Sequence, residues 1–158
     1  MEETIVAPAT PAGRGGISII RISGRGAKEV GLNLCGELPK SWSFKPCSIL
    51  DGSGVLIDSG LVVFFGAPKS YTGEDVVEIH CHGNPVVVDS VVAASVFFGA
   101  RVAEPGEFTK RAFLNDKIDL AQAESVADLI AAQTSSALVA ANSSLSGEFS
   151  QLINKTID

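Results

Sequence analysis

Residues 76–99 read VVEIHCHGNPVVVDSVVAASVFFG, and this stretch contains the clearest boundary between a strand and a helix in the chain. Apolar residues alternate around Glu78 from residue 76 to 81, which predicts a β-strand. Asn84 is a preferred N-cap residue, Pro85 suits the first helical position, and Gly99 offers a stop. The many valines lower helix propensity, but the signals at the two ends outweigh that effect. The stretch therefore predicts a strand over 76–81 followed by a helix from residue 85.

The residues near the amino terminus predict a second pair of strand and helix. Residues 17–22 follow a glycine-rich turn and alternate β-branched with polar side chains, so we expect a strand there. Ser23 is expected to cap a short helix that ends near Gly36, although three glycines weaken that helix. Residues 38–46 contain two prolines and several polar residues, and we expect a loop.

Between these two pairs, the sequence predicts a β-hairpin. Residues 47–50 and 55–65 flank Asp51-Gly52-Ser53-Gly54, which is a strong turn signal. A last strand is expected over 101–103. The order is then strand, helix, several strands, helix, strand. We expect an α+β sandwich related to the ferredoxin-like arrangement, with the helices on one face of a mostly antiparallel sheet.

The character of the chain changes after residue 105. Residues 107–114 predict a short helix, and from Asp119 onward no glycine or proline occurs until Gly147. Asp119 and Gln122 have the spacing of a capping box. Residues 134–136 are expected to separate two long helices, the second of which continues through Phe149 and Leu152. This pattern predicts the start of a helical bundle that is cut off at residue 158. We therefore expect one domain over 1–117 and the start of a helical domain over 118–158.

Composition and charge exclude several classes of protein. The chain has 12 Lys and Arg against 18 Asp and Glu, a formal net charge of −6, so it is a poor candidate for binding nucleic acid unaided. Cys35, Cys47 and Cys81 include no C-x-x-C pair, which favours reduced thiols in a cytosol. The amino terminus does not resemble a secretory signal, and the longest apolar run, 86–100, is interrupted and too short to span a bilayer. We expect a cytoplasmic protein.

Two candidate motifs for chemistry are weak. The glycines at 13–16 precede a strand, whereas a phosphate-binding loop follows one, and no G-x-x-x-x-G-K-[S/T] motif occurs in the chain. A tight turn is favoured there, and a nucleotide site is not expected. His80 and His82 would face one side of a strand, as a pair of metal ligands does, but the spacing suggests no third ligand. A polar pair beside the Asn84 cap is favoured, and no metal is expected. A general-base role stays open, without an identifiable nucleophile.

Arg21 and Glu78 are charged residues that interrupt two apolar strands. Unpaired buried charge is costly, so both side chains need partners or solvent. One interpretation is solvent-facing alternation or a salt bridge between the two strands. The other is a cleft for a ligand with planar amide-like edges and acidic groups, because a carboxylate accepts two parallel N–H bonds and a guanidinium suits carboxylates or carbonyls. Spacing gives no special weight to Lys117, which follows a predicted turn.

Six segments of the chain resemble one known family, the tRNA modification GTPases called MnmE or TrmE. The most specific part is the block from Pro105 to Glu124, most of which belongs to the segment AEPGEFTKRAFLN at 103–115. The other segments are TPAGRGG at 10–16, IRISG at 20–24, YTGEDVVE at 71–78 and HGNP at 82–85, with KIDLAQAE at 117–124 closing the last block. The similarity runs in order through essentially the whole chain.

The resemblance implies an amino-terminal α+β domain that binds a tetrahydrofolate derivative and forms homodimers. It also implies a helical domain interrupted by a GTPase domain. Members act with a flavin-dependent partner, MnmG (GidA), to modify carbon 5 of the wobble uridine of certain tRNAs. The family's folate contacts fall on Arg21, Glu78 and Lys117. The GTP, potassium and magnesium sites of the family, and its carboxy-terminal cysteine motif, have no counterpart in this sequence.

Two other functions stay open at this point. One is a structural dimerisation domain without a working folate site, and the other is a self-sufficient folate-dependent aminomethyltransferase. The second is disfavoured because the chain shows no internal repeat of the strand–helix pattern. The folate hypothesis requires that Arg21 and Glu78 lie on one face of the sheet and are not sealed inside it.

Overall fold

The computed structural model describes residues 3–147 of the 158. The chain divides between Pro105 and Gly106 into two compact units, which are described separately. The first unit has six strands and two helices, and the second has three helices in its described part. No helix in the described part of the chain is long and apolar enough to cross a membrane.

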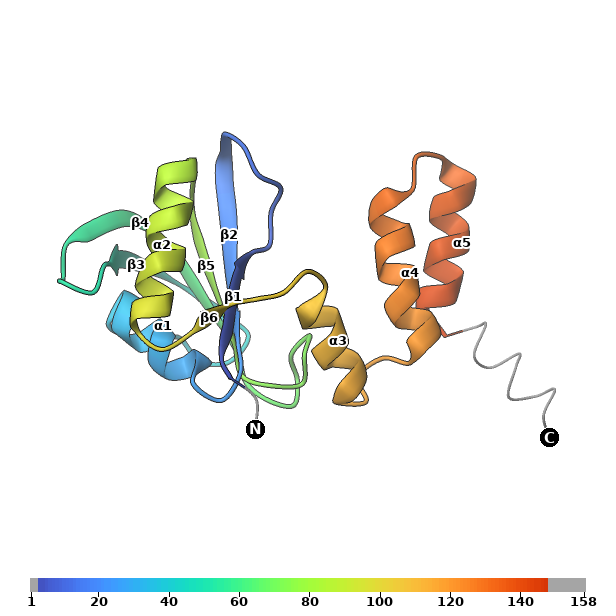
Figure 1. The fold of residues 1–158 in the computed structure, drawn as a ribbon, viewed down its shortest axis with the longest axis horizontal. Helices are drawn as coiled ribbons and strands as arrows, with labels where there is room; N and C mark the ends of the chain where they lie inside the picture. The colour runs from blue at the N-terminus through green and yellow to red at the C-terminus, as the bar shows by residue number, and fades with distance from the viewer. Residues whose placement is uncertain (1–2, 148–158) are drawn as a thin grey trace. The chain divides into compact units, whose positions relative to one another are not determined.

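The first unit is a single sheet with both of its helices, α1 (Ala27–Cys35) and α2 (Pro85–Phe97), on one face (Figure 1). The strand order is β3-β4-β5-β2-β1-β6, and every neighbouring pair is antiparallel except β1 with β6. This arrangement confirms the predicted α+β fold with a mostly antiparallel sheet. The strands are β1 (Ile5–Pro8), β2 (Gly15–Ser23), β3 (Ser43–Leu50), β4 (Leu56–Phe65), β5 (Val76–Gly83) and β6 (Arg101–Val102).

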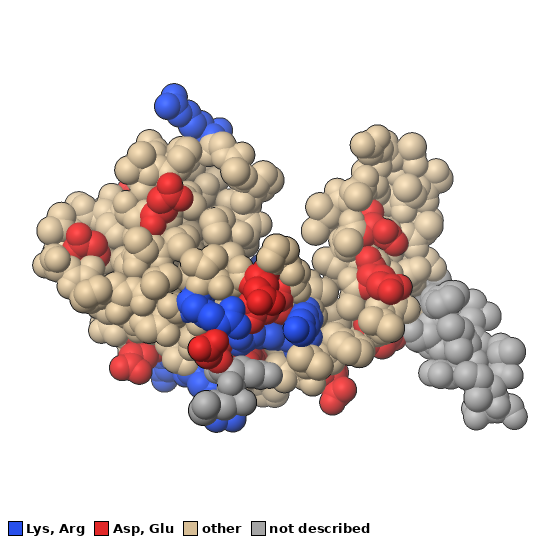
Figure 2. Space-filling model, viewed as in Figure 1, with Lys and Arg blue, Asp and Glu red and all other residues tan. Residues whose placement is uncertain are grey.

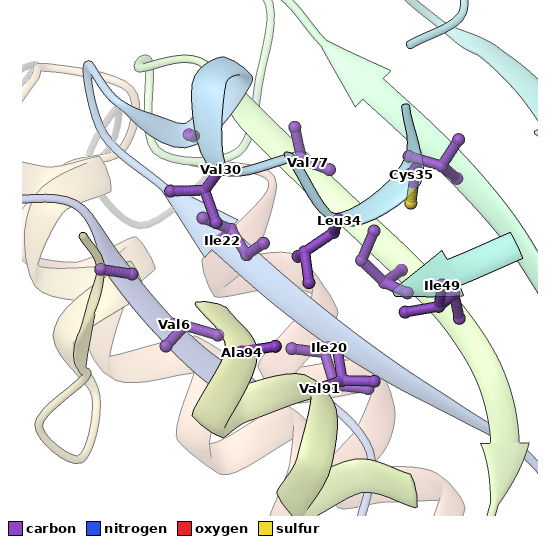
Figure 3. Close-up of a cluster of buried hydrophobic side chains, with 14 of the residues drawn as sticks. Val6, Ile20, Ile22, Val30, Leu34, Cys35, Ile49, Val77, Val91 and Ala94 are labelled. Carbon is purple, nitrogen blue, oxygen red and sulfur yellow. The ribbon is translucent and has the colours of Figure 1, made fainter. Parts of the chain in front are cut away.

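The hydrophobic core lies between the two helices and the sheet (Figure 3). Ile20 and Ile22 of β2 are fully buried, as are Val77 and Ile79 of β5. They pack in one cluster with side chains of α1 and α2. Because successive side chains of a strand point to opposite faces, the residues between them point away from the helices. The core therefore decides where the intervening charged residues of β2 and β5 lie.

The start of α2 confirms the signal at Asn84. The Asn84 side chain accepts a hydrogen bond of 2.9 Å from the backbone N–H of Val86, and Pro85 is the first helical residue. Gly99 follows the helix with φ +103°, a left-handed conformation that glycine adopts without strain. The predicted hairpin is also confirmed, since β3 and β4 pair around the turn at 51–54.

The prediction that Ser23 caps α1 is wrong. Ser23 is the last residue of β2, and its hydroxyl bonds the side chains of Thr72 and Glu74 at 2.7 and 2.8 Å. Gly26 occupies the N-cap position, and its N–H donates to the Thr4 hydroxyl at 2.9 Å. A distant threonine therefore satisfies a helix-end donor that a local serine was expected to satisfy.

Two strand assignments also needed correction. Residues 38–46 were expected to form a loop, but β3 begins at Ser43 and pairs with β4 from its first residue. Pro46 is tolerated there because β3 is an edge strand, where one side of the backbone has no neighbour to bond. The sequence also did not predict β1, a strand of four residues that ends in Pro8 and lies between β2 and β6.

The second unit begins with α3 (Glu107–Leu114), followed by α4 (Leu120–Ala131) and α5 (Ser135–Leu145). The predicted capping box is present: the Asp119 side chain accepts from the Gln122 backbone N–H at 2.8 Å, and the Gln122 side chain accepts from the Asp119 backbone N–H at 2.9 Å. Thr134 caps α5, as the predicted break between two helices requires. The continuation of this helical pattern through Phe149 and Leu152 lies outside the described residues.

The α4–α5 pair carries acidic but no basic side chains. Residues 118–147 include no Lys or Arg, and Figure 2 shows red but no blue over these two helices on the face in view. Nucleic-acid binding depends on clustered Lys and Arg. Residues 118–147 therefore lack the clustered cations on which such binding depends.

Candidate ligand site on the open face of the sheet

Arg21 and Glu78 lie directly opposite each other on β2 and β5. The Nε and Nη2 atoms of Arg21 both lie 2.8 Å from Oε1 of Glu78. The two side chains are 27% and 13% exposed, on the sheet face that the helices leave uncovered. The predicted salt bridge between the strands is therefore present. It is open to solvent on one side, so it can also contact a ligand.

The pair belongs to a row that crosses five strands. Phe44 pairs with Val63, Val63 with Glu78, Glu78 with Arg21, and Arg21 with Ala7. Residues in such cross-strand register share one face of the sheet. The β3 end of the row is apolar and its centre is charged. An amphipathic ligand lying along this row would meet both kinds of surface.

Aromatic rings stand on two sides of the charged pair. The Arg21 guanidinium lies 5.3 Å from the centre of the Tyr71 ring, within cation–π distance. His80 Nε2 lies 3.4 Å from Oε2 of Glu78, and the Phe44 ring meets the His80 ring edge-on at 5.7 Å. Flat rings beside a fixed carboxylate are a suitable surface for a planar heterocycle, because rings stack and N–H edges bond carboxylates.

The loop between β4 and β5 places Tyr71. Asp75 accepts a hydrogen bond from the Ala67 N–H at 2.9 Å and so ties the two ends of the loop together. Thr72 is fully buried and bonds Ser23 at 2.7 Å. These contacts fix the residues next to Tyr71 against the end of β2. Because Ser23 and Arg21 both belong to β2, these contacts fix the Tyr71 ring beside Arg21.

His82 does not join His80 in a metal site. Its Nδ1 lies 2.9 Å from Oδ1 of Asp58, while His80 faces Glu78. Burial alone would raise the pKa of Asp58, but hydrogen bonds from the His82 backbone and ring lower it below its usual value. Within residues 3–147, no group of three or more His, Cys, Asp or Glu side chains is arranged to hold a metal ion.

Two hollows lie near the predicted motifs of the first unit. One of about 170 Å³ is lined by His80 together with Ile17, Leu61 and His82. The other, of about 290 Å³, is lined by the loop at 10–13 and by Asp89 at the start of α2. Asp89 is a negatively charged residue in the lining of the second hollow.

Comparison with known proteins gives the family. The family model described as the GTP-binding protein TrmE N-terminus matches residues 4–117. The chain belongs to this family. It is 53% identical over 155 residues to the tRNA modification GTPase MnmE of Neisseria meningitidis serogroup B (strain ATCC BAA-335 / MC58), covering 98% of the chain and 35% of that protein.

Two further relatives carry the same name. The tRNA modification GTPase MnmE of Legionella pneumophila (strain Corby) is 52% identical over 156 residues, which are 97% of this chain and 34% of the relative. The tRNA modification GTPase MnmE of Nitrosomonas eutropha (strain DSM 101675 / C91 / Nm57) is 50% identical over 155 residues, which are 98% of this chain and 34% of the relative. The chain thus spans about a third of the length of these relatives.

Lys117, the third predicted contact, is the last residue matched by the TrmE N-terminal model. It lies in the second unit, directly after α3, and its backbone N–H donates to the carbonyl of Ala112 at 2.9 Å. Arg21 and Glu78 lie in the first unit. The structure brings these two together, and the part that Lys117 plays beside them stays a prediction.

Sequence reasoning missed the aromatic members of the site. Tyr71 lies in a segment that resembles the TrmE family, but nothing in its spacing placed it over Arg21. Phe44 fell in the expected loop at 38–46. His80 was considered as a metal ligand, whereas its neighbour is the Glu78 carboxylate. The structure shows Tyr71 at Arg21 and His80 at Glu78, with Phe44 against the His80 ring.

Proposed function

We propose that this chain is the folate-binding and dimer-forming part of a cytoplasmic tRNA modification GTPase. The parent protein would use a tetrahydrofolate derivative as one-carbon donor for carboxymethylaminomethyl modification at carbon 5 of the wobble uridine. It would act as a homodimer with the flavin-dependent MnmG (GidA) partner. GTP hydrolysis, with potassium and magnesium, would belong to a domain outside these residues. The observation that supports the proposal is the solvent-open Arg21–Glu78 pair between aromatic rings.

Glu78 would bind the 2-amino-pyrimidinone edge of the pterin ring. A carboxylate has about four acceptor positions. Arg21 donates to Oε1 and His80 lies 3.4 Å from Oε2, so these neighbours hold the Glu78 carboxylate in a fixed orientation and occupy only part of its acceptor capacity. A fixed partner binds a ligand better because less freedom is lost on binding. Tyr71 and Phe44 would contact the flat ring.

Arg21 and Lys117 would orient the formyl or glutamyl part of the cofactor. Both are cations, and the glutamyl tail carries carboxylates. We accordingly keep the folate-binding domain at residues 1–117, with the helical domain beginning at 118. The 170 Å³ hollow beside His80 is smaller than the roughly 300–1,000 Å³ of ordinary ligand pockets. Most of the cofactor would therefore lie along the open face.

The acidic charge of the chain agrees with a role in binding the cofactor and not the tRNA. The net charge is −6, and α4 and α5 carry no cation. Binding of tRNA phosphates requires Lys and Arg clusters. The tRNA would therefore be held by the full complex rather than by this chain alone.

Titration calorimetry with 5-formyltetrahydrofolate tests the cofactor site. We expect the 158-residue chain to bind with micromolar affinity and Glu78→Gln to weaken binding at least about tenfold, because hydrogen bonds to a charged group are lost. The matched control is Glu37→Gln, which removes the same charge from an exposed residue paired with Lys45. Binding to Glu37→Gln should equal that of the unchanged chain. Circular dichroism establishes that both variants fold.

A structural dimerisation scaffold is the alternative function. Absence of any binding heat in the unchanged chain, or equal affinity in Glu78→Gln, would support that alternative and contradict the folate proposal. The titration thus separates the two functions without requiring the rest of the parent protein.

The exposed apolar side chains support dimer formation. Trp42 and Phe44 on the β3 side of the sheet are 64% and 63% exposed, and Ile130 of α4 is 81% exposed. Exposed apolar patches are typical of protein interfaces. Light scattering of the 158-residue chain should give the mass of a dimer. A single monomeric mass at high protein concentration would contradict this part of the proposal.

A further inference from the structure

His82, near the end of β5, is held by Asp58 of β4. The Asp58 carboxylate accepts a hydrogen bond from the His82 backbone N–H at 2.8 Å. Nδ1 of the His82 ring lies 2.9 and 3.0 Å from the two oxygens of the same carboxylate. Asp58 also accepts the backbone N–H of Ser59 at 2.8 Å, and its side chain is only 14% exposed. One anchored carboxylate therefore holds both the backbone and the ring of His82.

These contacts select one tautomer of the His82 ring. The two backbone N–H groups that bond Asp58 favour its ionised form, and an ionised carboxylate only accepts hydrogen bonds. Nδ1 of His82 therefore carries a proton, and Nε2 of the neutral ring is an acceptor. No residue between 3 and 147 bonds Nε2, and the side chain is 71% exposed. Many acid–base residues of enzymes are histidines that a carboxylate orients in this way.

His82 borders the hollow of about 170 Å³ on the open face of the sheet. Glu78, His80 and His82 alternate along β5, so all three point to the face that the helices leave uncovered. His82 lies four residues from Glu78, which is roughly 13 Å along a strand. The hollow is therefore next to the surface on which the proposed cofactor would lie.

The lining of this hollow suits a small amine. Ile17 and Leu61 give it apolar walls, and the described residues that line it include no Lys or Arg. Because the Asp58 carboxylate lies behind His82, a cation is favoured there over an anion. The hollow is smaller than the roughly 300 Å³ at which ordinary ligand pockets begin, so its occupant would be a small molecule.

We infer that His82, positioned by Asp58, is the acid–base residue of the proposed one-carbon transfer and takes a proton from a small amine in the hollow. The inference rests on the proposed function, because an aminomethyl group joins the transferred carbon to a nitrogen. An amine attacks carbon only as the neutral base, and most amines are protonated at neutral pH. Histidine is the side chain best suited to accept such a proton near pH 7.

The inferred step is a single proton transfer. The amine enters as an ammonium ion, and one of its N–H bonds breaks. The proton bonds to Nε2 of His82, while the electron pair of the broken bond stays on the nitrogen and makes it nucleophilic. His82 becomes an imidazolium ion, which the Asp58 carboxylate stabilises. The exposed ring then returns the proton to solvent.

Nitrogen-15 NMR of the 158-residue chain tests the position of the proton. The chain has only two histidines, so His80→Gln identifies the signals of His82. At a pH at which the ring is neutral, Nδ1 should be protonated and Nε2 should not. Asp58→Asn keeps one oxygen for the backbone N–H groups but removes the charge, so the preference for protonated Nδ1 should weaken. A proton on Nε2 of the unchanged chain would overturn the inference.

The parent protein and its partner test the chemical role. His82→Asn is the informative variant, because its amide can still donate to Asp58 but leaves no group at the position of Nε2. It should lower the rate of tRNA modification at least about 100-fold, whereas the affinity of the 158-residue chain for 5-formyltetrahydrofolate should change less than about twofold. In His82→Ala, added imidazole should restore part of the rate, which a purely structural role would not allow.

The possible failures are distinguishable. A full modification rate in His82→Asn would overturn the inference and leave the proposed function intact. Equal losses of rate and of cofactor affinity, or no restoration by imidazole, would overturn it too, because they indicate a structural role. Absence of folate binding by the unchanged chain would overturn the proposed function, and the inference with it.

Discussion

Replacing Ile20 with alanine should lower the free energy of unfolding of the chain by about 3 kcal/mol, because it opens a cavity in the centre of the core. Ile20 is fully buried, lies on the central strand β2, and pairs with the equally buried Ile79. The core is sealed on its other side by α1 and α2 (Figure 3). A site enclosed by two strands and two helices can collapse only partly around the missing atoms, so the cost should lie well above that of a surface change.

Ile17→Ala is the matched control for this prediction. Ile17 lies on the same strand but is 67% exposed, so the same substitution removes little buried surface. Urea unfolding followed by circular dichroism should show a much lower midpoint concentration for Ile20→Ala than for the unchanged chain. For Ile17→Ala, the free energy of unfolding should lie within about 0.5 kcal/mol of that of the unchanged chain. Equal destabilisation by both substitutions would show that the core does not lie on the predicted side of β2.

Local signals predicted the elements that begin or end with a distinctive residue. Asn84 and Pro85 predicted the start of α2, the capping box at Asp119 predicted the start of α4, and the turn at 51–54 predicted the β3–β4 hairpin. Each of these signals acts through hydrogen bonds within a few residues. Such bonds depend mainly on nearby residues, so they can be predicted from a single sequence.

Elements that depend on distant partners were not predictable in this way. β1 is only four residues long and exists because β2 and β6 lie on either side of it. The segment from Ser43 to Pro46 contains a proline and becomes a strand only because β4 pairs with it on one side. Ser23 has local capping potential, but its hydroxyl bonds residues about 50 positions later. Tertiary contacts override local propensity in all three cases.

The candidate site shows the same division. A charge in the middle of each apolar strand identified Arg21 and Glu78. Strand alternation explains why both side chains point to the face opposite the core. The register that sets them opposite each other comes from the structure. The positions of Tyr71 and Phe44 depend on a loop and on a misassigned strand, so the sequence could not place them. Lys117 was identified by family resemblance, and its role remains to be tested.

Gly60→Ala should destabilise the chain by about 3 kcal/mol or more, because the added methyl has no space. A Cβ atom at Gly60 of β4 would lie 2.0 Å from the backbone carbonyl oxygen of His80 on β5. The backbone fixes the position of the Cβ, and the oxygen belongs to the His80 backbone, so no side-chain rotation can relieve the clash. The two strands would have to separate where β4 and β5 are paired, close to Glu78.

The same substitution should weaken folate binding if Glu78 and His80 form the proposed site. Movement of β5 at His80 would shift the carboxylate two residues away, whereas Arg21 on β2 would stay in place. Gly16→Ala is the control, since no atom lies within 4 Å of a Cβ at Gly16 of β2. It should unfold at the original urea concentration or slightly above, and bind 5-formyltetrahydrofolate normally. A Gly60→Ala chain with unchanged stability would show that β4 and β5 do not pair as closely as described. A destabilised but folded chain with full affinity would instead place the ligand away from β5.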